Sequence, residues 1–404
     1  MTGPTTIPPV TRREASVAEL VASTAPVLDA LRADASLRES ERRHPSAEIR
    51  ALAGLGILRL RLPEADGGAG GTVRDLAEFV INLAAADSNV AQALRPSFLV
   101  ADAVAQDTTA SAARDRTLRR IHAGDLFAGT RNEADGGPGA IGTQLRRDGD
   151  GYRVSGSKFY STGGLHAQWF SGTARDESDA IASFSVPTSR AGVTLLDDFD
   201  AVGQRLTASG TTLFDNARLE ADEVSFELER PRHPGGSLAH LYLAAVLAGI
   251  ATAALADAIA FAREIARPIK HSTAARSVDD PYVRHAVGDI AAHSLAARGA
   301  VLLAAETLDA AFTLPPDAAG AEAAGLLATT TVASAQQTAA REALAAAEAV
   351  FDVGGGRAVR HEHNLDRHWR NARTVANHNP VAWKSAVVGA FLLSGETPPN
   401  NGLF

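Results

Sequence analysis

The spacing of apolar residues changes twice along this chain of 404 residues, and this change limits the possible folds more than any other feature. Residues 14–124 place apolar side chains at i, i+3, i+4 and i+7, the spacing of amphipathic helices. Residues 125–234 alternate polar with β-branched or aromatic residues between Gly, Asp and Asn turns, which is typical of strands. Helical spacing returns in residues 235–404. The pattern therefore predicts a helical domain, a small antiparallel β domain and a second helical domain.

The last of these regions holds four long periodic segments, near 238–268, 282–311, 317–350 and 381–394. Their Ala-rich faces allow close packing and predict an antiparallel four-helix bundle. They carry more apolar surface than one bundle can bury, which favours a homotetramer. The apolar stretch at 241–256 is shorter than the roughly 20 residues that span a bilayer, so we expect a buried helix and no membrane insertion.

Charge and cysteine content narrow the function. The chain has 47 acidic and 39 basic residues, a net charge of -8, and no run of Lys or Arg, so nucleic acid is not an expected partner. It has no cysteine, which excludes disulfides and thiolate chemistry and fits a reducing compartment. Residues 1–13 contain Pro and Thr where an export signal needs apolar residues, so we expect a disordered tail and a cytoplasmic protein.

A glycine pattern in the middle region suggests a nucleotide site that its flanks exclude. Gly137, Gly139 and Gly142 spell G-x-G-x-x-G. A dinucleotide-binding fingerprint follows a strand and opens a helix, whereas these glycines follow the polar TRNEAD and lead into a strand-like segment. We interpret them as a loop.

Two segments that flank this loop carry more information. Thr130 to Gly137 reads TRNEADGG, and Gly156 to Gly163 reads GSKFYSTG. In position and type they resemble the two β-domain segments with which acyl-CoA dehydrogenases hold the isoalloxazine ring of their flavin. The resemblance implies that Ser161 hydrogen-bonds the flavin near N5, that Asn132 lies in a neighbouring loop, and that the flavin site also includes Thr130 and Thr162.

The C-terminal stretch from Phe351 to Pro380 extends the resemblance over nearly the whole chain. It parallels the family's order of a Gly-Gly loop, then L-E/D-R, then R-D-A-R/K. On this match Gly354, Gly355, Arg370 and Asn379 belong to the cofactor site. The resemblance implies an N-terminal helical domain, a β-barrel-like middle domain, a C-terminal four-helix bundle and usually a tetramer, in which neighbouring subunits complete the flavin site.

One departure from the dehydrogenase pattern concerns the catalytic base. An acyl-CoA dehydrogenase removes an α-proton with a glutamate that follows the R-D-A-R/K motif, and in this chain that position is Asn379. An amide cannot accept the proton. The other position that some members use lies on the first helix of the bundle, where no carboxylate stands near Gly249.

The neighbour of Asn379 points to a different reaction. His378, in the run HWRNARTVANHNP, resembles the dibenzothiophene monooxygenase branch of the same fold. The resemblance implies reduced FMN or FAD supplied by a separate NAD(P)H:flavin reductase, addition of dioxygen to form a C4a-hydroperoxyflavin, and transfer of one oxygen atom to a small hydrophobic substrate containing sulfur, nitrogen or an aromatic ring. Histidine, with a pKa near 6.5, suits proton management at this peroxide, together with Ser161 and Asn132.

The chain also differs from this branch in places. Ser97 and Val375 stand where relatives tend to carry histidines, which indicates a different proton route. His361, His363 and His368 lack a metal-ligand spacing, so we expect no metal site.

Aromatic residues supply candidates for an apolar substrate lining. We expect Phe98, Phe159, Trp169 and Trp383 at the substrate, with Phe214 as a further candidate. Two other functions remain open from sequence alone: an FAD-dependent acyl-CoA dehydrogenase with a relocated base, and a catalytically inactive helical assembly module.

Overall fold

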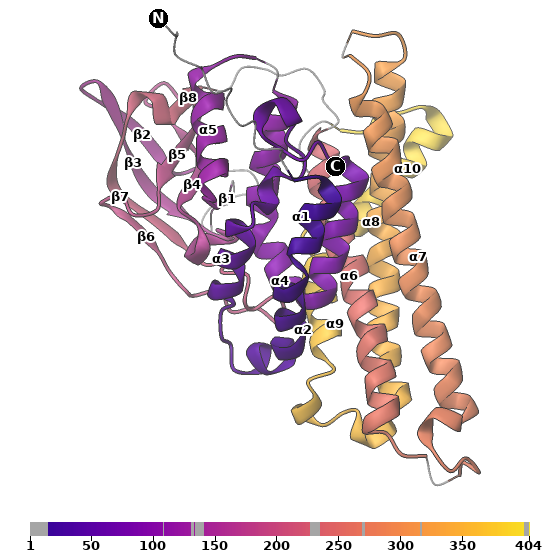
Figure 1. Ribbon diagram of the computed structural model, residues 1–404. Coiled ribbons are helices and arrows are strands. Elements are labelled where there is room, and N and C mark those ends of the chain that lie inside the picture. The colour runs from indigo at the N-terminus through magenta and orange to yellow at the C-terminus, as the bar shows by residue number, and fades with distance from the viewer. Residues whose placement is uncertain are drawn as a thin grey trace, which may run out of the picture.

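The N-terminal region is helical in the computed structural model, which describes residues 15–107, 109–130, 133, 141–226, 235–268, 271–315, 317–399 and 404 (Figure 1). Some of its helices begin at side-chain caps; Ser16 and Thr72 form capping boxes with Glu19 and Asp75. Their bounds are α1 (Val17–Ser23), α2 (Ala25–Ser40), α3 (Ser46–Gly54), α4 (Val73–Gln106) and α5 (Ala112–Ala123), with short 3-10 turns at Ile57–Arg59 and Glu64–Asp66.

The middle region forms a single eight-stranded sheet. Seven strands follow the order β6-β7-β3-β2-β4-β5-β8, and β1 pairs with β4. Most neighbours are antiparallel, but β1 runs parallel to β4 along its full length, and β2 pairs in parallel with β4 at Gln144 and Arg175. The expectation of an antiparallel domain was therefore wrong, since the sheet is mixed. The strands are β1 (Phe127–Thr130), β2 (Gln144–Asp148), β3 (Gly151–Lys158), β4 (Trp169–Arg175), β5 (Ile181–Pro187), β6 (Val193–Leu195), β7 (Thr212–Leu219) and β8 (Val224–Phe226).

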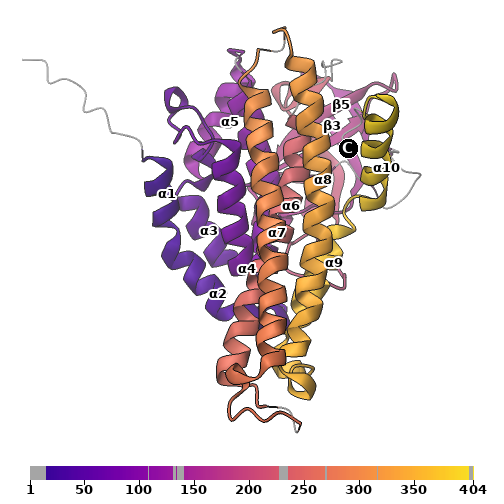
Figure 2. The same cartoon turned by 90° about the vertical axis from the view of Figure 1, so that its right-hand side faces the viewer.

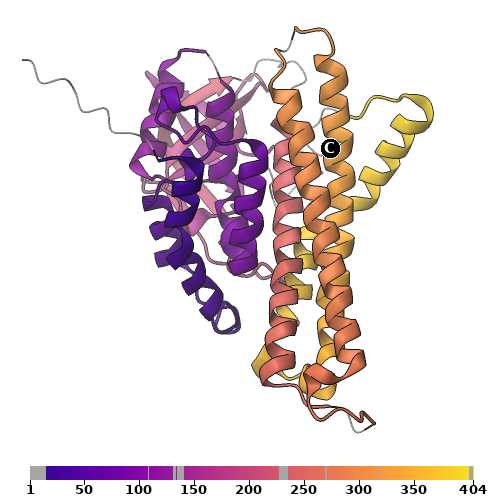
Figure 3. The ribbon, with the colours of Figure 1, turned by 45° about the vertical axis from the view of Figure 1, so that its right-hand side comes forward.

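Three long helices form the C-terminal bundle, and a fourth diverges from it. Helices α6, α7 and α8 pack along one another, while α10 leans away from their upper end (Figures 2 and 3). The expected long segments are confirmed as α6, α7, α8 and α10 within a few residues, whereas α9 was not predicted. The bounds are α6 (Gly235–Glu264), α7 (Pro281–Phe312), α8 (Ala321–Ala349), α9 (Arg367–Ala376) and α10 (Val381–Ser394), with 3-10 turns at Val350–Val353, Gly355–Arg357 and His361–His363.

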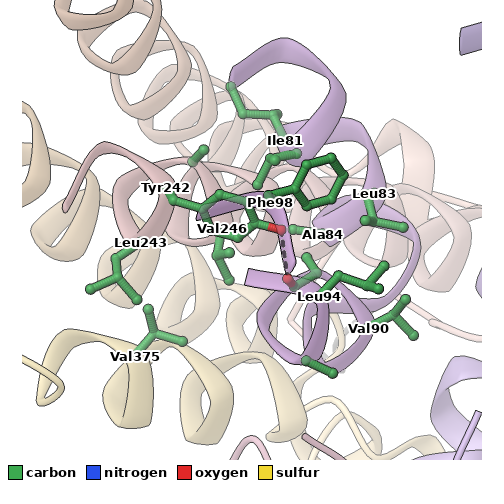
Figure 4. Close-up of a cluster of buried hydrophobic side chains, with 14 of the residues drawn as sticks. Ile81, Leu83, Ala84, Val90, Leu94, Phe98, Tyr242, Leu243, Val246 and Val375 are labelled. Atoms are coloured by element: carbon green, nitrogen blue, oxygen red, sulfur yellow. Dashed lines mark hydrogen bonds between the residues drawn. The ribbon is translucent and has the colours of Figure 1, made fainter. Parts of the chain in front are cut away.

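The core between the two helical regions is formed by α4 and α6. Small residues bring these helices together, because a Cβ on Gly249 would lie 2.4 Å from Cβ of Ala84 and 2.6 Å from the carbonyl oxygen of Ile81. Phe98 and Tyr242 pack across the contact with ring centroids 5.9 Å apart (Figure 4). The Tyr242 hydroxyl donates a 2.7 Å hydrogen bond to the carbonyl of Ala91, which satisfies its polar atom inside the core.

The order of helical, β and helical regions predicted from the sequence is confirmed. The apolar stretch at 241–256 is part of α6, and most of its side chains are buried, as expected. Residues 1–13, predicted as a tail, lie outside the described residues.

Candidate active site

Helix α4 is interrupted at Asp87, and this interruption organises the site. Asp87 has extended backbone angles (φ -157°, ψ 111°) inside an otherwise helical run. Its Oδ1 accepts from the backbone N–H of Asn89 at 2.9 Å, so it caps a second helical segment. Its Oδ2 accepts from Arg38 on α2 at 3.0 Å, and both side chains are buried. The second half of α4 therefore begins at a fixed point.

The two residues that follow Asp87, Ser88 and Asn89, bind the β domain. Gln204 donates through Nε2 to the hydroxyl of Ser88 at 3.0 Å, and the Leu206 N–H donates to Oδ1 of Asn89 at 3.1 Å. The backbone N–H of Gln204 also donates to Oδ1 of Asn371 on α9 at 2.7 Å. The loop between β6 and β7 thus contacts both helical regions, which fixes their relative positions.

Buried hydroxyl groups line the β-domain side of this junction. Thr162 and Thr207 both contact the Ser209 hydroxyl, at 3.0 and 2.7 Å. Thr212 donates to Oγ of Ser161 at 2.7 Å, so the proton of Ser161 has no acceptor among the described residues. Beside Ser161 lies a shallow hollow whose other lining residues are mainly apolar. They are Gly164, Leu165, Leu195, Leu196, Ala208, Gly210 and Thr211.

The two loops that carry these hydroxyls, after β3 and between β6 and β7, hold residues in the left-handed region. Tyr160 has φ 61° and Ala208 has φ 50°. Gly163, with φ 79°, could not carry a side chain in any case, because a Cβ would lie 2.4 Å from the Ala93 carbonyl on α4. Left-handed non-glycine residues cost about 1–3 kcal/mol each and cluster at ligand sites.

His378, in the turn between α9 and α10, faces α4. Its Nε2 lies 3.2 Å from Nη1 of Arg95, and its Nδ1 lies 2.6 Å from Oδ1 of Asn379. Because a guanidinium only donates, Nε2 of His378 must accept, and the ring proton therefore sits on Nδ1. The contacts define one neutral tautomer.

Asn379 connects this histidine to α6. Its Nδ2 lies 3.2 Å from Nδ1 of His240, and both residues are buried. The amide thus contacts an imidazole on each side. The residue at the position of the dehydrogenase base is a positioning group for His378 rather than an acid or base.

The charge state of His378 differs from the sequence expectation. Although the residue is exposed, its ring is crowded by protein atoms, and this burial together with the positive charge of Arg95 lowers its pKa to about 4. The expected pKa near 6.5 was too high, since sequence alone did not place Arg95 beside the ring. His378 is therefore neutral at pH 7, with a lone pair on Nε2.

Arg370, predicted to belong to the cofactor site, lies on α9 between α2 and the turn that precedes α9. Its guanidinium contacts Glu39 on α2 at 2.6 Å, Asp366 at 2.8 Å and Oδ1 of Asn364 at 2.8 Å. The hydrogen bonds that it donates to Glu39 and Asp366 raise its pKa above the ordinary value. Arg370 thus joins the N-terminal helices to α9, and its donors are used within the chain.

Gly354 and Gly355 lie in the turns at the lower end of the bundle, opposite α10 (Figure 1). A Cβ on Gly354 would meet the ring of Phe261 at 2.0 Å, whereas Gly355 faces open space. The chain does not bring them together with Ser161 or His378.

The predicted aromatic lining is dispersed. Phe98 is 3% exposed and belongs to the core (Figure 4), and Phe214 is buried in the sheet against Phe170. The Trp169 ring lies under the guanidinium of Arg120, 3.2 Å from its centroid, and Trp383 is 57% exposed on α10.

Of the predicted lining residues, Phe159 lies nearest to the hydroxyl cluster in the chain. It is half-buried and packs on Tyr160, with centroids 4.4 Å apart. Val375 is buried in the core (Figure 4), and Ser97 exchanges hydrogen bonds with the backbone of Phe127. Asn132 lies outside the described residues, and of Thr130 only the backbone, in β1, is described.

Arg95 and His240 were missed by sequence reasoning. Arg95 did leave a signal, because a single arginine interrupts the apolar run from Val90 to Ala101. His240 left none, since one histidine in an apolar helix is most often a satisfied core residue.

Comparison with known proteins identifies the fold. The acyl-CoA dehydrogenase N-terminal domain matches residues 17–125, and the acyl-CoA dehydrogenase C-terminal domain matches residues 241–383. Dibenzothiophene monooxygenase of Rhodococcus qingshengii is 31% identical over 406 residues, 96% of each chain. The chain belongs to the acyl-CoA dehydrogenase family.

Further relatives place it in one branch of that family. SfnC of Pseudomonas putida, a probable FMNH2-dependent monooxygenase, is 29% identical over 363 residues, 88% of this chain and 89% of its own. The structure of methanesulfinate monooxygenase MsuC from Pseudomonas fluorescens has a TM-score of 0.86 at 26% identity, covering 95% of this chain and 99% of that one. The protein is a flavin-dependent monooxygenase, and the predicted branch is confirmed.

The structure explains why both dehydrogenase base positions are lost in this member. Asn379 is committed to His378 and His240. Gly249 lies in the close crossing of α4 and α6, where even a methyl group would collide with Ala84. A carboxylate has no room at that crossing.

Proposed function

We propose that this monooxygenase receives reduced FMN from a separate NAD(P)H:flavin reductase and oxidises a small substrate containing sulfur or an aromatic ring. The names of its relatives support the proposal, since they include a dibenzothiophene, a methanesulfinate and an FMNH2-dependent monooxygenase. In the overall reaction, substrate, dioxygen and reduced flavin give oxidised product, water and oxidised flavin. One oxygen atom goes to the substrate and the other to water.

One observation carries the proposal: the position of the dehydrogenase base holds an amide that fixes a neutral histidine. A dehydrogenase needs a base of suitable pKa to remove a proton from carbon. An oxygenase needs hydrogen-bonding groups of defined protonation and a site from which water is excluded. The neutral histidine and the amide that fixes it supply the hydrogen-bonding groups of the second requirement.

The donors present fit a flavin. Ser161 carries a hydroxyl proton that has no acceptor in the described chain, and it lies beside an apolar hollow. Isoalloxazine combines an apolar plane with oxygen and nitrogen acceptors at its edge, so such a mixed surface suits it. We assign Ser161 and Thr162, with Thr130 and Asn132 of the adjoining segment, to holding the ring. When bound, the reduced flavin supplies the two electrons that reduce dioxygen.

His378 then controls a proton at the reacting oxygen. In this structure the Nε2 lone pair accepts from Arg95 at 3.2 Å; it can accept from an O–H group when Arg95 turns to a ligand, while Asn379 keeps the ring proton on Nδ1. Arg95 supplies a positive charge next to that position, where negative charge develops as dioxygen is reduced. This role replaces the proton donor near pH 7 that sequence alone favoured.

A homotetramer in the cytoplasm remains part of the proposal. Long apolar side chains on the outer faces of α7, α8 and α10 are uncovered in the single chain, which supports self-association. They include Leu295, Leu303, Leu327, Leu392 and Leu393. Assembly through these helices would also let the Gly354–Gly355 turn of one subunit serve the flavin site of another.

The decisive experiment is a coupled assay with an NADH:flavin reductase, FMN or FAD, and ¹⁸O₂. We expect product carrying one ¹⁸O atom with FMN, and tighter binding of reduced than of oxidised FMN in anaerobic equilibrium dialysis. Reduction of tightly bound FAD by an acyl-CoA without reductase would establish the dehydrogenase instead. Absence of flavin binding in both redox states would establish an assembly module.

A further inference from the structure

Arg95 is a cation that has no anionic partner among the described residues. Its Nη1 lies 3.2 Å from Nε2 of His378, and its Nε is buried with no hydrogen-bond acceptor in the same part of the chain. Within the described parts of the chain, no Asp or Glu forms an ion pair with it. By contrast, the buried Arg38 and the largely buried Arg61 and Arg370 each contact at least one carboxylate.

This arrangement is energetically unfavourable for the chain alone. Arg95 as a residue is half-buried, but its Nε is enclosed and unpaired in the described chain, whereas enclosed guanidinium groups are normally paired. Burial lowers the pKa of Arg95 to about 10, which still leaves the group fully charged at pH 7. The positive charge of Arg95 forms no ion pair within the described chain, so it is available to bind a ligand.

A second unsatisfied group lies on the same side of the helix. Gln92 precedes Arg95 by three residues, so their side chains are neighbours on α4. Oε1 of Gln92 is buried and has no partner in the described chain. An amide can turn over and present its NH₂ group instead. Gln92 and Arg95 together therefore offer donors to one ligand.

We infer that Arg95 binds an acidic group of the substrate, so that the chain oxidises a small organic acid, such as a sulfinate or a carboxylate, held beside His378. The inference rests on the proposed function and names its substrate class. A guanidinium donates two parallel hydrogen bonds to two oxygens of one acid group, which fixes orientation as well as position. Because Arg95 contacts His378, an acid bound to Arg95 places its neighbouring atoms within reach of Nε2.

The dispersed aromatic residues favour the same conclusion. Phe98 is used in the core, Trp169 stacks under Arg120, and Trp383 is on an outer helix. The groups that do meet at the site are a cation, two imidazoles and two amides. This set selects a charged, polar molecule over a wholly apolar one.

The phosphate of FMN is the other anion that could reach a cation here, and the experiment separates the two. Calorimetric titrations use methanesulfinate and benzoate as acids, with dimethyl sulfoxide and benzamide as neutral counterparts. FMN and riboflavin are titrated separately. The proteins are wild type, Arg95→Lys, Arg95→Gln and, as a control, Arg119→Gln, which changes an exposed arginine on α5.

We expect wild type to bind at least one of the two acids. Its affinity for the neutral counterpart of that acid should be much lower. Arg95→Gln should weaken acid binding about 30-fold or more, the effect of removing one member of a buried charge pair. Arg95→Lys should retain part of it, and Arg119→Gln should match wild type. Unchanged acid binding in Arg95→Gln overturns the inference. If, in addition, wild type prefers FMN over riboflavin and Arg95→Gln loses that preference, Arg95 binds the phosphate of FMN instead.

A measurement on wild type alone guards against variants that do not fold. Methanesulfinate should shift the ring resonances of His378 in NMR spectra of histidine-labelled protein, and dimethyl sulfoxide should not. Equal responses to both compounds contradict the inference. Failure of the inference differs from failure of the proposed function. If wild type transfers ¹⁸O to neutral substrates and binds neither acid, only the inference is wrong; if it binds an acid but shows no flavin-dependent oxygen transfer, only the proposed function is wrong.

Discussion

Oδ1 of Asn379 lies 2.6 Å from Nδ1 of His378, so a residue that cannot itself carry a proton decides which nitrogen of its neighbour does. This relationship replaces the acid–base residue of the dehydrogenases with a fixed imidazole. A single substitution at Asn379 should therefore change the pKa of His378.

Asn379→Asp should raise the pKa of His378 by about 1–3 units, because a carboxylate next to the ring favours the imidazolium form. NMR titration of labelled histidine measures this pKa. The control is Asn377→Asp, which adds the same charge at an exposed position in the same turn. A pKa that rises equally in both variants would mean that the contact with Asn379 does not set the protonation of His378.

His378→Ala should abolish coupling while reduced-flavin binding and the fold persist. The loss of a positioned acid–base group lowers the rate of product formation by about 10²- to 10⁴-fold. Dioxygen should then leave as hydrogen peroxide, with peroxide released per flavin consumed approaching one. His361→Ala, a change at an exposed histidine, should behave as wild type. Wild-type coupling in His378→Ala would make His378 a structural residue.

Arg370→Ala should act on stability. Burial alone would raise the pKa of Glu39, but hydrogen bonds from Arg370 and Asn364 outweigh it and lower that pKa. Removing Arg370 leaves the buried Glu39 carboxylate with a longer contact to Arg205 at 3.4 Å and a hydrogen bond from Asn364. The loss of its strongest partner should cost about 1–3 kcal/mol of unfolding free energy, measured by urea denaturation. Arg373→Ala, on the exposed side of the same helix, is the control. A variant of full stability that no longer binds flavin would restore the role predicted from sequence.

Acid should destabilise the protein through His166. Burial, with a smaller effect of His44, lowers its pKa to about 4, against 6.5 in the unfolded chain. The unfolded state therefore binds the proton first as pH falls. The stabilisation is complete above pH 6.5 and is lost between 6.5 and 4, on the order of 3 kcal/mol in all. His166→Asn should flatten this part of the curve of unfolding free energy against pH, whereas His285→Asn, at an exposed site, should leave its slope unchanged.

Light scattering should give a tetramer, not the 41.9 kDa chain. The double variant Leu295→Glu, Leu303→Glu should dissociate it, because these side chains are 73% and 58% exposed on α7 in the single chain and a charge buried in an interface is costly. Leu37→Glu, at an equally exposed leucine of α2, should remain assembled. A monomeric wild type at micromolar concentration would contradict the prediction.

The order of the domains was predictable because it depends on periodicity, which is a local property. The parallel pairing of β1 with β4 was not, since Phe127 and Trp169 are joined only through the arrangement of the whole sheet. The sequence at the break in α4 does contain a helix-capping residue, Asp87, which accepts from Asn89. The break was not predicted because Asp87 stands inside a run of residues with uninterrupted helical spacing.

The site was predictable in part. His378 and Asn379 came from their place in a motif, and the structure shows them in contact. Arg370 matched a motif equally well, yet its partner Glu39 lies 331 residues away in sequence, and no local pattern reports that pairing. Arg95 was overlooked because an arginine without a carboxylate is recognised only when its surroundings in space are known.

The interruption at Asp87 gives the two halves of α4 independent rotational phases. A continuous helix turns every downstream residue by about 100° for each inserted or deleted residue, so a length change before Asp87 would swing Arg95 away from His378. Since Asp87, Ser88 and Asn89 are clamped by Arg38 and by the β6–β7 loop, such a change can be absorbed at the break. The first half of α4 can therefore change in length without changing the direction in which the Arg95 side chain points.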